Sequence, residues 1–102
     1  NIFAVRDGAL ITPPVTDGAL EGITRATVLE IAEEQGIPFR IETLGRFDLF
    51  GSDEIFLTGT GARIVSVATL DGQPIGRPGH HPLADRLSEA FTRFTRDHGI
   101  PF

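Results

Sequence analysis

Two of the three Asp-Gly dipeptides, those at residues 7–8 and 71–72, constrain the fold of this chain more than any other feature. Each separates two short runs that are rich in apolar residues. A two-residue hairpin turn needs positive φ angles, which glycine adopts freely, so Asp-Gly between apolar runs is a strong hairpin signal. The sequence therefore predicts two hairpins. Their strands are expected at residues 1–5 and 9–12 for the first and at 64–70 and 73–76 for the second.

Two segments have the apolar spacing of amphipathic helices. The first runs from Thr24 to about Gln35, with its apolar side chains along one face and Gly36 as its stop. The second begins near Pro82, a residue suited to a first helical turn. Short strands at 38–44 and 55–58 and a helical turn at 46–52 complete a mixed α/β (α+β) domain. The apolar face of the second helix consists of Leu83, Leu87, Ala90, Phe91 and Phe94.

Length and composition limit the classes of protein to consider. The 102 residues suffice for one domain. The net charge is −5 and no basic cluster is present, which argues against a nucleic-acid surface. No apolar run approaches the roughly 18 residues of a membrane span. Cysteine is absent, which excludes disulfides and thiolate metal sites. Because the chain starts Asn-Ile-Phe, we interpret it as a piece of a longer chain or a truncated reading frame.

Two glycine-containing segments have the character of anion-binding loops. Residues 20–25 place Gly22 and Thr24 at the start of the first helix, where unpaired amides and the helix dipole favour a phosphate. Residues 56–62 lead from a strand into a Gly-Thr-Gly turn, whose successive amides can form an anion-binding nest. Each segment can also be explained without a ligand. Residues 20–25 could be an ordinary helix start, and residues 56–62 could be a strand end with turn glycines.

Other polar clusters are weaker candidates. The neighbours His80 and His81 point to opposite sides of an extended backbone, and no third ligand follows nearby, so we expect a loop pair without a metal role. Asp53 and Glu54 diverge in the same way, and no general acid/base role follows for them.

The two loop segments, their order and their spacing resemble the signature of class IV (fold type IV) pyridoxal-phosphate aminotransferases, above all the branched-chain amino-acid aminotransferases. Supporting matches are the Asp-Gly hairpin, the Thr-Pro-Pro at residues 12–14 and the Pro-Gly at 78–79. The resemblance covers essentially the whole chain. It implies one partial domain at residues 1–102, belonging to the larger, cofactor-binding C-terminal domain, with its upstream part missing. The hairpins and strands should then form a sheet that upstream residues complete.

The resemblance also implies roles for particular residues. The Ile23 amide and the Thr24 amide and hydroxyl would hold the phosphate of pyridoxal 5'-phosphate, with Gly22 allowing the close approach. Leu20 would pack against the pyridine ring. Thr60 would give a second phosphate contact through its hydroxyl, and the Thr60 and Gly61 amides would face the substrate carboxylate.

Two departures bear on activity. Arg63 stands where the family commonly has an acidic residue, which would favour a more acidic substrate if Arg63 is not simply a solvated strand residue. The chain has no lysine, whereas the cofactor's chemistry needs one. In the family that lysine lies upstream, so this chain is expected to hold no catalytic residue.

The resemblance implies a cytoplasmic, homodimeric enzyme that transfers an amino group between a branched-chain or related amino acid and 2-oxoglutarate. D-amino-acid transaminase, amine transaminase and aminodeoxychorismate lyase share the fold and remain alternatives. A different class is also open: a lysine-free remnant that binds a phosphorylated small molecule without catalysis, or a structural module.

Overall fold

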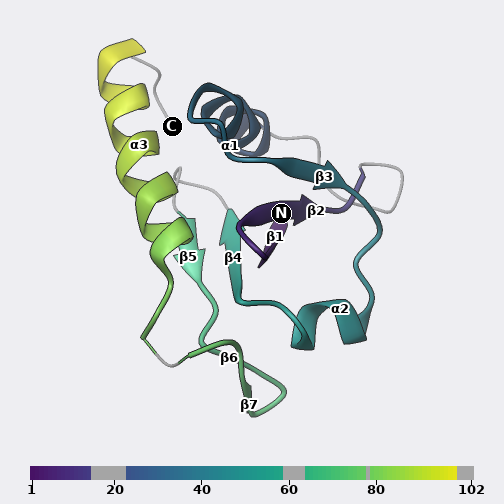
Figure 1. The fold of residues 1–102 in the computed structure, drawn as a ribbon. Coiled ribbons are helices and arrows are strands. Elements are labelled where there is room, and N and C mark those ends of the chain that lie inside the picture. The colour runs from purple at the N-terminus through teal and green to yellow at the C-terminus, as the bar shows by residue number, and fades with distance from the viewer. Residues whose placement is uncertain (15–22, 59–63, 78, 99–102) are drawn as a thin grey trace.

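A five-stranded sheet with two helices against one of its faces forms most of the molecule (Figure 1). The structure is a computed structural model, and it describes residues 1–14, 23–58, 64–77 and 79–98. The strand order is β3-β2-β1-β4-β5, and β6 and β7 make a separate two-stranded sheet. In chain order the elements are β1 (Ile2–Arg6), β2 (Ala9–Thr12), α1 (Ile23–Glu34), β3 (Phe39–Ile41), α2 (Arg46–Phe50), β4 (Glu54–Thr58), β5 (Ile64–Ser66), β6 (Thr69–Leu70), β7 (Gln73–Pro74) and α3 (Pro82–His98).

Both predicted hairpin turns are confirmed. Asp7 and Gly8 have φ angles of 52° and 78°, and Asp71 and Gly72 have φ angles of 50° and 78°. Two successive positive φ angles are those of a type I′ turn, whose twist matches that of the flanking strands. The first turn joins β1 to β2, and the second joins β6 to β7.

The prediction of one continuous strand at residues 64–70 is wrong. Ser66 pairs with Phe56, which is close to the first residue of β4. Beyond Ser66, β4 therefore offers few further residues for β5 to pair with. The next two residues bond in different directions, since the Val67 N–H donates to the Ile55 carbonyl and the Ala68 carbonyl accepts from Ile75. The chain thus leaves one sheet and starts the other within two residues.

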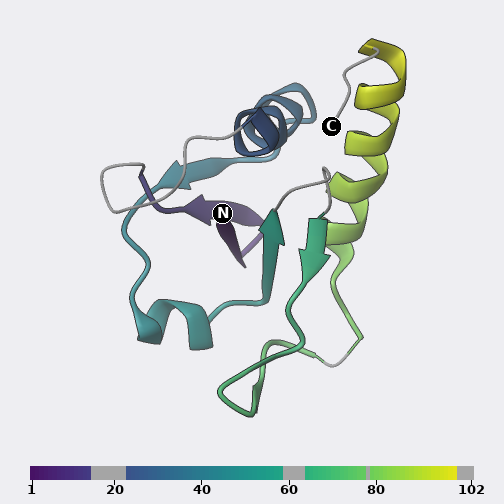
Figure 2. The ribbon, with the colours of Figure 1, turned by 180° about the vertical axis from the view of Figure 1, so that it is seen from behind.

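Helices α1 and α3 cover one face of the large sheet, as the two opposite views show (Figures 1 and 2). The rings of Phe3 and Phe56 stack beneath them, with centroids 5.0 Å apart. The apolar faces predicted for both helices are confirmed, because their residues join the buried core with these strands. The core consists of Phe3, Val5, Leu10, Val28, Ile31, Ala32, Ile37, Phe56, Ala84, Leu87, Ala90 and Phe91, with Leu83 and Phe94 packed against it.

Helix α1 ends where the sequence predicts. Gly36 has a φ of 70°, its N–H donates to the Glu33 carbonyl (3.2 Å), and the Ile37 N–H donates to the Ala32 carbonyl (2.8 Å). This pair of bonds is a Schellman motif, which satisfies carbonyls that the helix leaves free. The chain then runs parallel to β2 as β3, which is shorter than the strand predicted at 38–44.

The face of the sheet away from α1 and α3 is covered only in part. Ile2, Leu57 and Val65 lie in one row across β1, β4 and β5 on this face. Leu57 is 43% exposed and Val65 is 53% exposed. Among the described helices, none is both long enough and apolar enough to cross a membrane.

Candidate functional site

Most of the residues expected to form the site lie outside the described part of the chain: Leu20 and Gly22 in 15–22, and Thr60 and Gly61, together with Arg63, in 59–63. The structure describes the backbone of Ile23 and the whole of Thr24. Ile23 begins α1 and Thr24 is half-buried in its first turn, which confirms the predicted helix start.

The strand ends that lead into both loops meet at one edge of the sheet. At the end of β2, the Thr12 hydroxyl donates to the Ile2 carbonyl (2.8 Å). At the end of β4, the Thr58 N–H donates to the Asn1 carbonyl (2.8 Å), and the N-terminal ammonium donates to the Thr58 carbonyl (2.7 Å). Residues far apart in the sequence, Thr12 and Thr58, therefore flank the beginning of β1.

The first turn of α1 is attached to the same edge. The Arg25 guanidinium donates to the carbonyl of Pro13, just after β2, at 3.2 Å. The Arg25 Nε is buried and has no hydrogen-bond partner among the described residues. The first amides of an α-helix have no partners within the helix and carry partial positive charge, so this end of α1 suits an anion. The described residues thus fit the binding of a phosphate at this edge.

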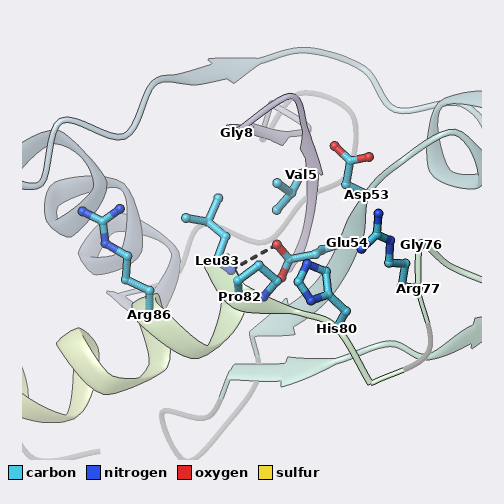
Figure 3. A pocket seen from close by; sticks show the side chains of 10 residues that line it. All are labelled: Val5, Gly8, Asp53, Glu54, Gly76, Arg77, His80, Pro82, Leu83 and Arg86. Atoms are coloured by element: carbon cyan, nitrogen blue, oxygen red, sulfur yellow. Dashed lines mark hydrogen bonds between the residues drawn. The ribbon is translucent and has the colours of Figure 1, made fainter.

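A hollow in the described part of the molecule lies away from this edge. Its volume is about 520 Å³, and it lies between the β1–β2 turn, the start of β4 and the first turns of α3 (Figure 3). Val5 and Glu54, which line it, pair with each other at the opposite end of β1 and β4 from Asn1 and Thr58. This hollow is therefore distinct from the edge where the expected cofactor loops begin.

Glu54 has a structural role that the sequence did not reveal. Only 6% of this residue is exposed. Its Oε2 accepts the Leu83 N–H (3.1 Å) and its Oε1 accepts the Ala84 N–H (3.0 Å), so a carboxylate from β4 caps α3. A helix cap supplied by a residue this far away in the chain cannot be predicted from a local sequence pattern. The neighbouring Asp53 accepts the Asp7 N–H instead (2.9 Å), and the two carboxylates diverge as predicted.

The adjacent histidines make different contacts. His81 Nδ1 lies 2.8 Å from Asp85 Oδ1, one turn along α3, whereas His80 lines the hollow. Within the described ranges, no group of three or more histidine, aspartate or glutamate side chains is placed to hold a metal ion.

Known proteins resemble this chain throughout its length. The family model described as amino-transferase class IV matches residues 1–70. The branched-chain-amino-acid aminotransferase of Escherichia coli (strain K12) is 43% identical over 91 residues, which are 89% of this chain and 29% of that protein. The D-alanine aminotransferase of Staphylococcus aureus (strain N315) is 36% identical over 100 residues, which are 98% of this chain and 36% of that protein.

Solved structures agree with the sequence matches. The structure of a branched-chain amino acid aminotransferase with pyridoxamine 5'-phosphate has a TM-score of 0.85 at 38% identity, over 91% of this chain and 30% of that one. The chain therefore belongs to the class IV aminotransferase family, and its fold is that of a fold type IV aminotransferase. It spans only 29% and 36% of the two relatives above.

Proposed function

We propose that the full-length protein is a pyridoxal-phosphate-dependent aminotransferase that transfers an amino group between a branched-chain or related amino acid and 2-oxoglutarate. The observation that carries this proposal is the convergence of β2, β4 and the first turn of α1 on one edge of the sheet, since it lets both expected anion loops serve one ligand. One of the two relatives above is named a branched-chain-amino-acid aminotransferase, and so is the protein of the solved structure with pyridoxamine 5'-phosphate.

In this proposal the chain supplies two anion contacts. The Ile23 and Thr24 amides and the Thr24 hydroxyl bind the cofactor phosphate, Gly22 allows its close approach, and Leu20 contacts the pyridine ring. Bound pyridoxal phosphate supplies an electron sink for the substrate's α-carbon. The lysine that this chemistry needs belongs to a segment outside the present sequence.

The second loop completes the proposed site. The Thr60 hydroxyl binds the phosphate as well, and the Thr60 and Gly61 amides bind the substrate carboxylate. Arg63 follows this loop in the sequence, and it would favour a more acidic substrate if it is not simply a solvated strand residue. We also propose that the residues 1–102 form part of a larger C-terminal domain and that the full-length enzyme is a cytoplasmic homodimer.

Thr24 provides the direct test of the phosphate contact. Replacing Thr24 by Ala should weaken cofactor binding by about 1–3 kcal/mol, because one hydrogen bond to a charged group is lost. The measurement is equilibrium dialysis of the full-length protein against pyridoxal phosphate. Thr69→Ala is the matched control, since Thr69 is exposed on β6, away from this edge. Cofactor binding by Thr24→Ala at the wild-type level would show the phosphate assignment to be wrong.

The D-alanine aminotransferase match supports a second candidate within the same fold. Transamination assays with 2-oxoglutarate and either L-leucine or D-alanine separate the two candidates. Turnover of L-leucine alone supports the branched-chain reading, and turnover of D-alanine alone replaces it. If protein that carries the upstream lysine turns over no amino donor, the result favours a non-catalytic phosphate-binding role.

A further inference from the structure

The hollow at the start of α3 has the size of a small-molecule site. Its volume of about 520 Å³ falls within the range of roughly 300–1,000 Å³ that ligand pockets occupy. Three separate segments line it: the β1–β2 turn, the start of β4, and the chain from Gly76 into α3. It lies at the opposite end of the sheet from the proposed cofactor site.

The amides at the start of α3 are not available to a ligand in this hollow. Glu54 Oε2 already accepts a hydrogen bond from the Leu83 N–H (Figure 3), and its Oε1 accepts one from the Ala84 N–H. The negative charge of Glu54 is therefore matched by the helix terminus. Recognition of a ligand must come from the remaining charged side chains.

Two of these side chains have opposite charges and spare bonding capacity. Asp53 accepts one hydrogen bond, from the Asp7 N–H to its Oδ2, and a carboxylate can accept several. The Arg77 guanidinium has five N–H donors and no hydrogen-bond or ion-pair partner among the described residues. Asp53 and Arg77 lie on the same side of the hollow (Figure 3).

The backbone brings the residues that carry these two charges together. Gly76 packs so closely on Asp53 that a Cβ atom there would overlap the Asp53 carbonyl oxygen. Arg77 is the next residue after Gly76. The chain that bears its guanidinium is therefore packed against Asp53. No ion pair forms between Asp53 and Arg77, so both side chains keep bonding capacity for a ligand.

The rest of the lining is largely apolar near the first turn of α3. Val5, Pro82 and Leu83 line the hollow there, and Val5 is buried. Arg86 marks the far side, where its Nε donates to Gln35 Oε1 (2.8 Å). A ligand of matching chemistry has an ammonium group, a carboxylate and an apolar body.

We propose that this hollow is a second binding site, for a free α-amino acid with an apolar side chain. Asp53 accepts from the α-ammonium group, Arg77 donates to the α-carboxylate, and Val5, Pro82 and Leu83 contact the side chain. The hollow carries both signs of charge, which disfavours a bare anion or a bare cation relative to a zwitterion. The inference does not depend on the proposed transamination.

Calorimetric titration of the full-length protein tests the site. The probe is α-methyl-leucine, which has no α-hydrogen and so is not transaminated. 4-Methylpentanoate lacks its ammonium group, and 3-methylbutylamine lacks its carboxylate. Saturable binding of α-methyl-leucine is expected, at least tenfold tighter than that of either truncated analogue.

The variants identify the site that binds. Arg77→Gln and Asp53→Asn should each weaken the binding of α-methyl-leucine at least tenfold, and Asn keeps an acceptor for the Asp7 N–H. The control Arg40→Gln, which removes an exposed cation on β3, should change it less than twofold. Melting temperatures within about two degrees of wild type show that the variants are folded.

The substrate site proposed around Thr60 also accepts amino acids, so binding in the hollow is the part of the titration that Arg77→Gln removes. Two results would overturn the proposal: no saturable binding, or equal binding of α-methyl-leucine by Arg77→Gln and wild type. Thr24→Ala separates the two sites. It should lower cofactor binding and leave binding in the hollow unchanged, so failure of one proposal is distinguishable from failure of the other.

Discussion

At the scale of single residues, the close approach of Gly76 to Asp53 distinguishes it from the other glycines with positive φ. Gly76 and Gly79 have φ angles of 59° and 73°, so both incur the same backbone penalty when a side chain is added. Only at Gly76 would the new Cβ meet the Asp53 carbonyl; at Gly79 nothing lies within 4 Å. The pair therefore separates the effect of the contact from the effect of the conformation.

We expect Gly79→Ala to lower the free energy of unfolding by about 1–2 kcal/mol, the cost of a left-handed residue. Gly76→Ala should lower it by at least about 2 kcal/mol more, because the backbone of Asp53 has to move. Urea unfolding of the full-length protein gives both values. Equal losses in the two variants would mean that the close approach contributes nothing.

At the scale of elements, Glu54 couples β4 to α3 and so fixes the helix that covers the strands. A hydrogen bond to a charged group contributes about 1.5–3 kcal/mol, and Glu54 accepts two from α3. Glu54→Gln keeps the shape but replaces one acceptor by an NH₂ group that faces an N–H donor. We expect it to lower the free energy of unfolding by about 2–3 kcal/mol.

Glu89→Gln is the control for Glu54→Gln. Glu89 forms an exposed pair with Arg93 one turn along α3, at 2.9 Å, and its loss should cost no more than about 0.5 kcal/mol. Urea unfolding of the two variants compares a buried cap with a surface pair on the same helix. A smaller loss in Glu54→Gln than in Glu89→Gln would contradict a stabilising role for the cap.

Elements whose signals are local could be predicted from the sequence. The Asp-Gly turns, the stop of α1 at Gly36 and the apolar face of α3 depend on neighbouring residues, and the structure confirms them. The break between β5 and β6 and the Glu54 cap depend on partners elsewhere in the chain, and the sequence did not predict them. For the candidate site, the start of α1 could be predicted, whereas the meeting of Thr12 and Thr58 around β1 depends on strand register.

At the scale of the whole molecule, the two faces of the large sheet differ. One is buried under α1 and α3. The other carries the row Ile2, Leu57 and Val65 across three strands, in which Leu57 and Val65 are exposed and Ile2 is half-buried. Apolar side chains that are adjacent on a sheet form a continuous patch, which water solvates poorly. In the isolated 102-residue chain, a second copy of the chain can cover this row.

The last prediction concerns this self-association. Burying a leucine or valine side chain contributes about 1.5–3 kcal/mol, so the isolated chain should associate through the row at micromolar concentrations. The double substitution Leu57→Thr and Val65→Thr keeps β-branched or strand-compatible side chains and should weaken association at least tenfold. Phe47→Thr is the control, because Phe47 is 92% exposed on α2 and outside the row. Sedimentation velocity measures association of all three chains. If the unsubstituted chain stays monomeric and melts in one sharp two-state transition, the exposed row does not drive association.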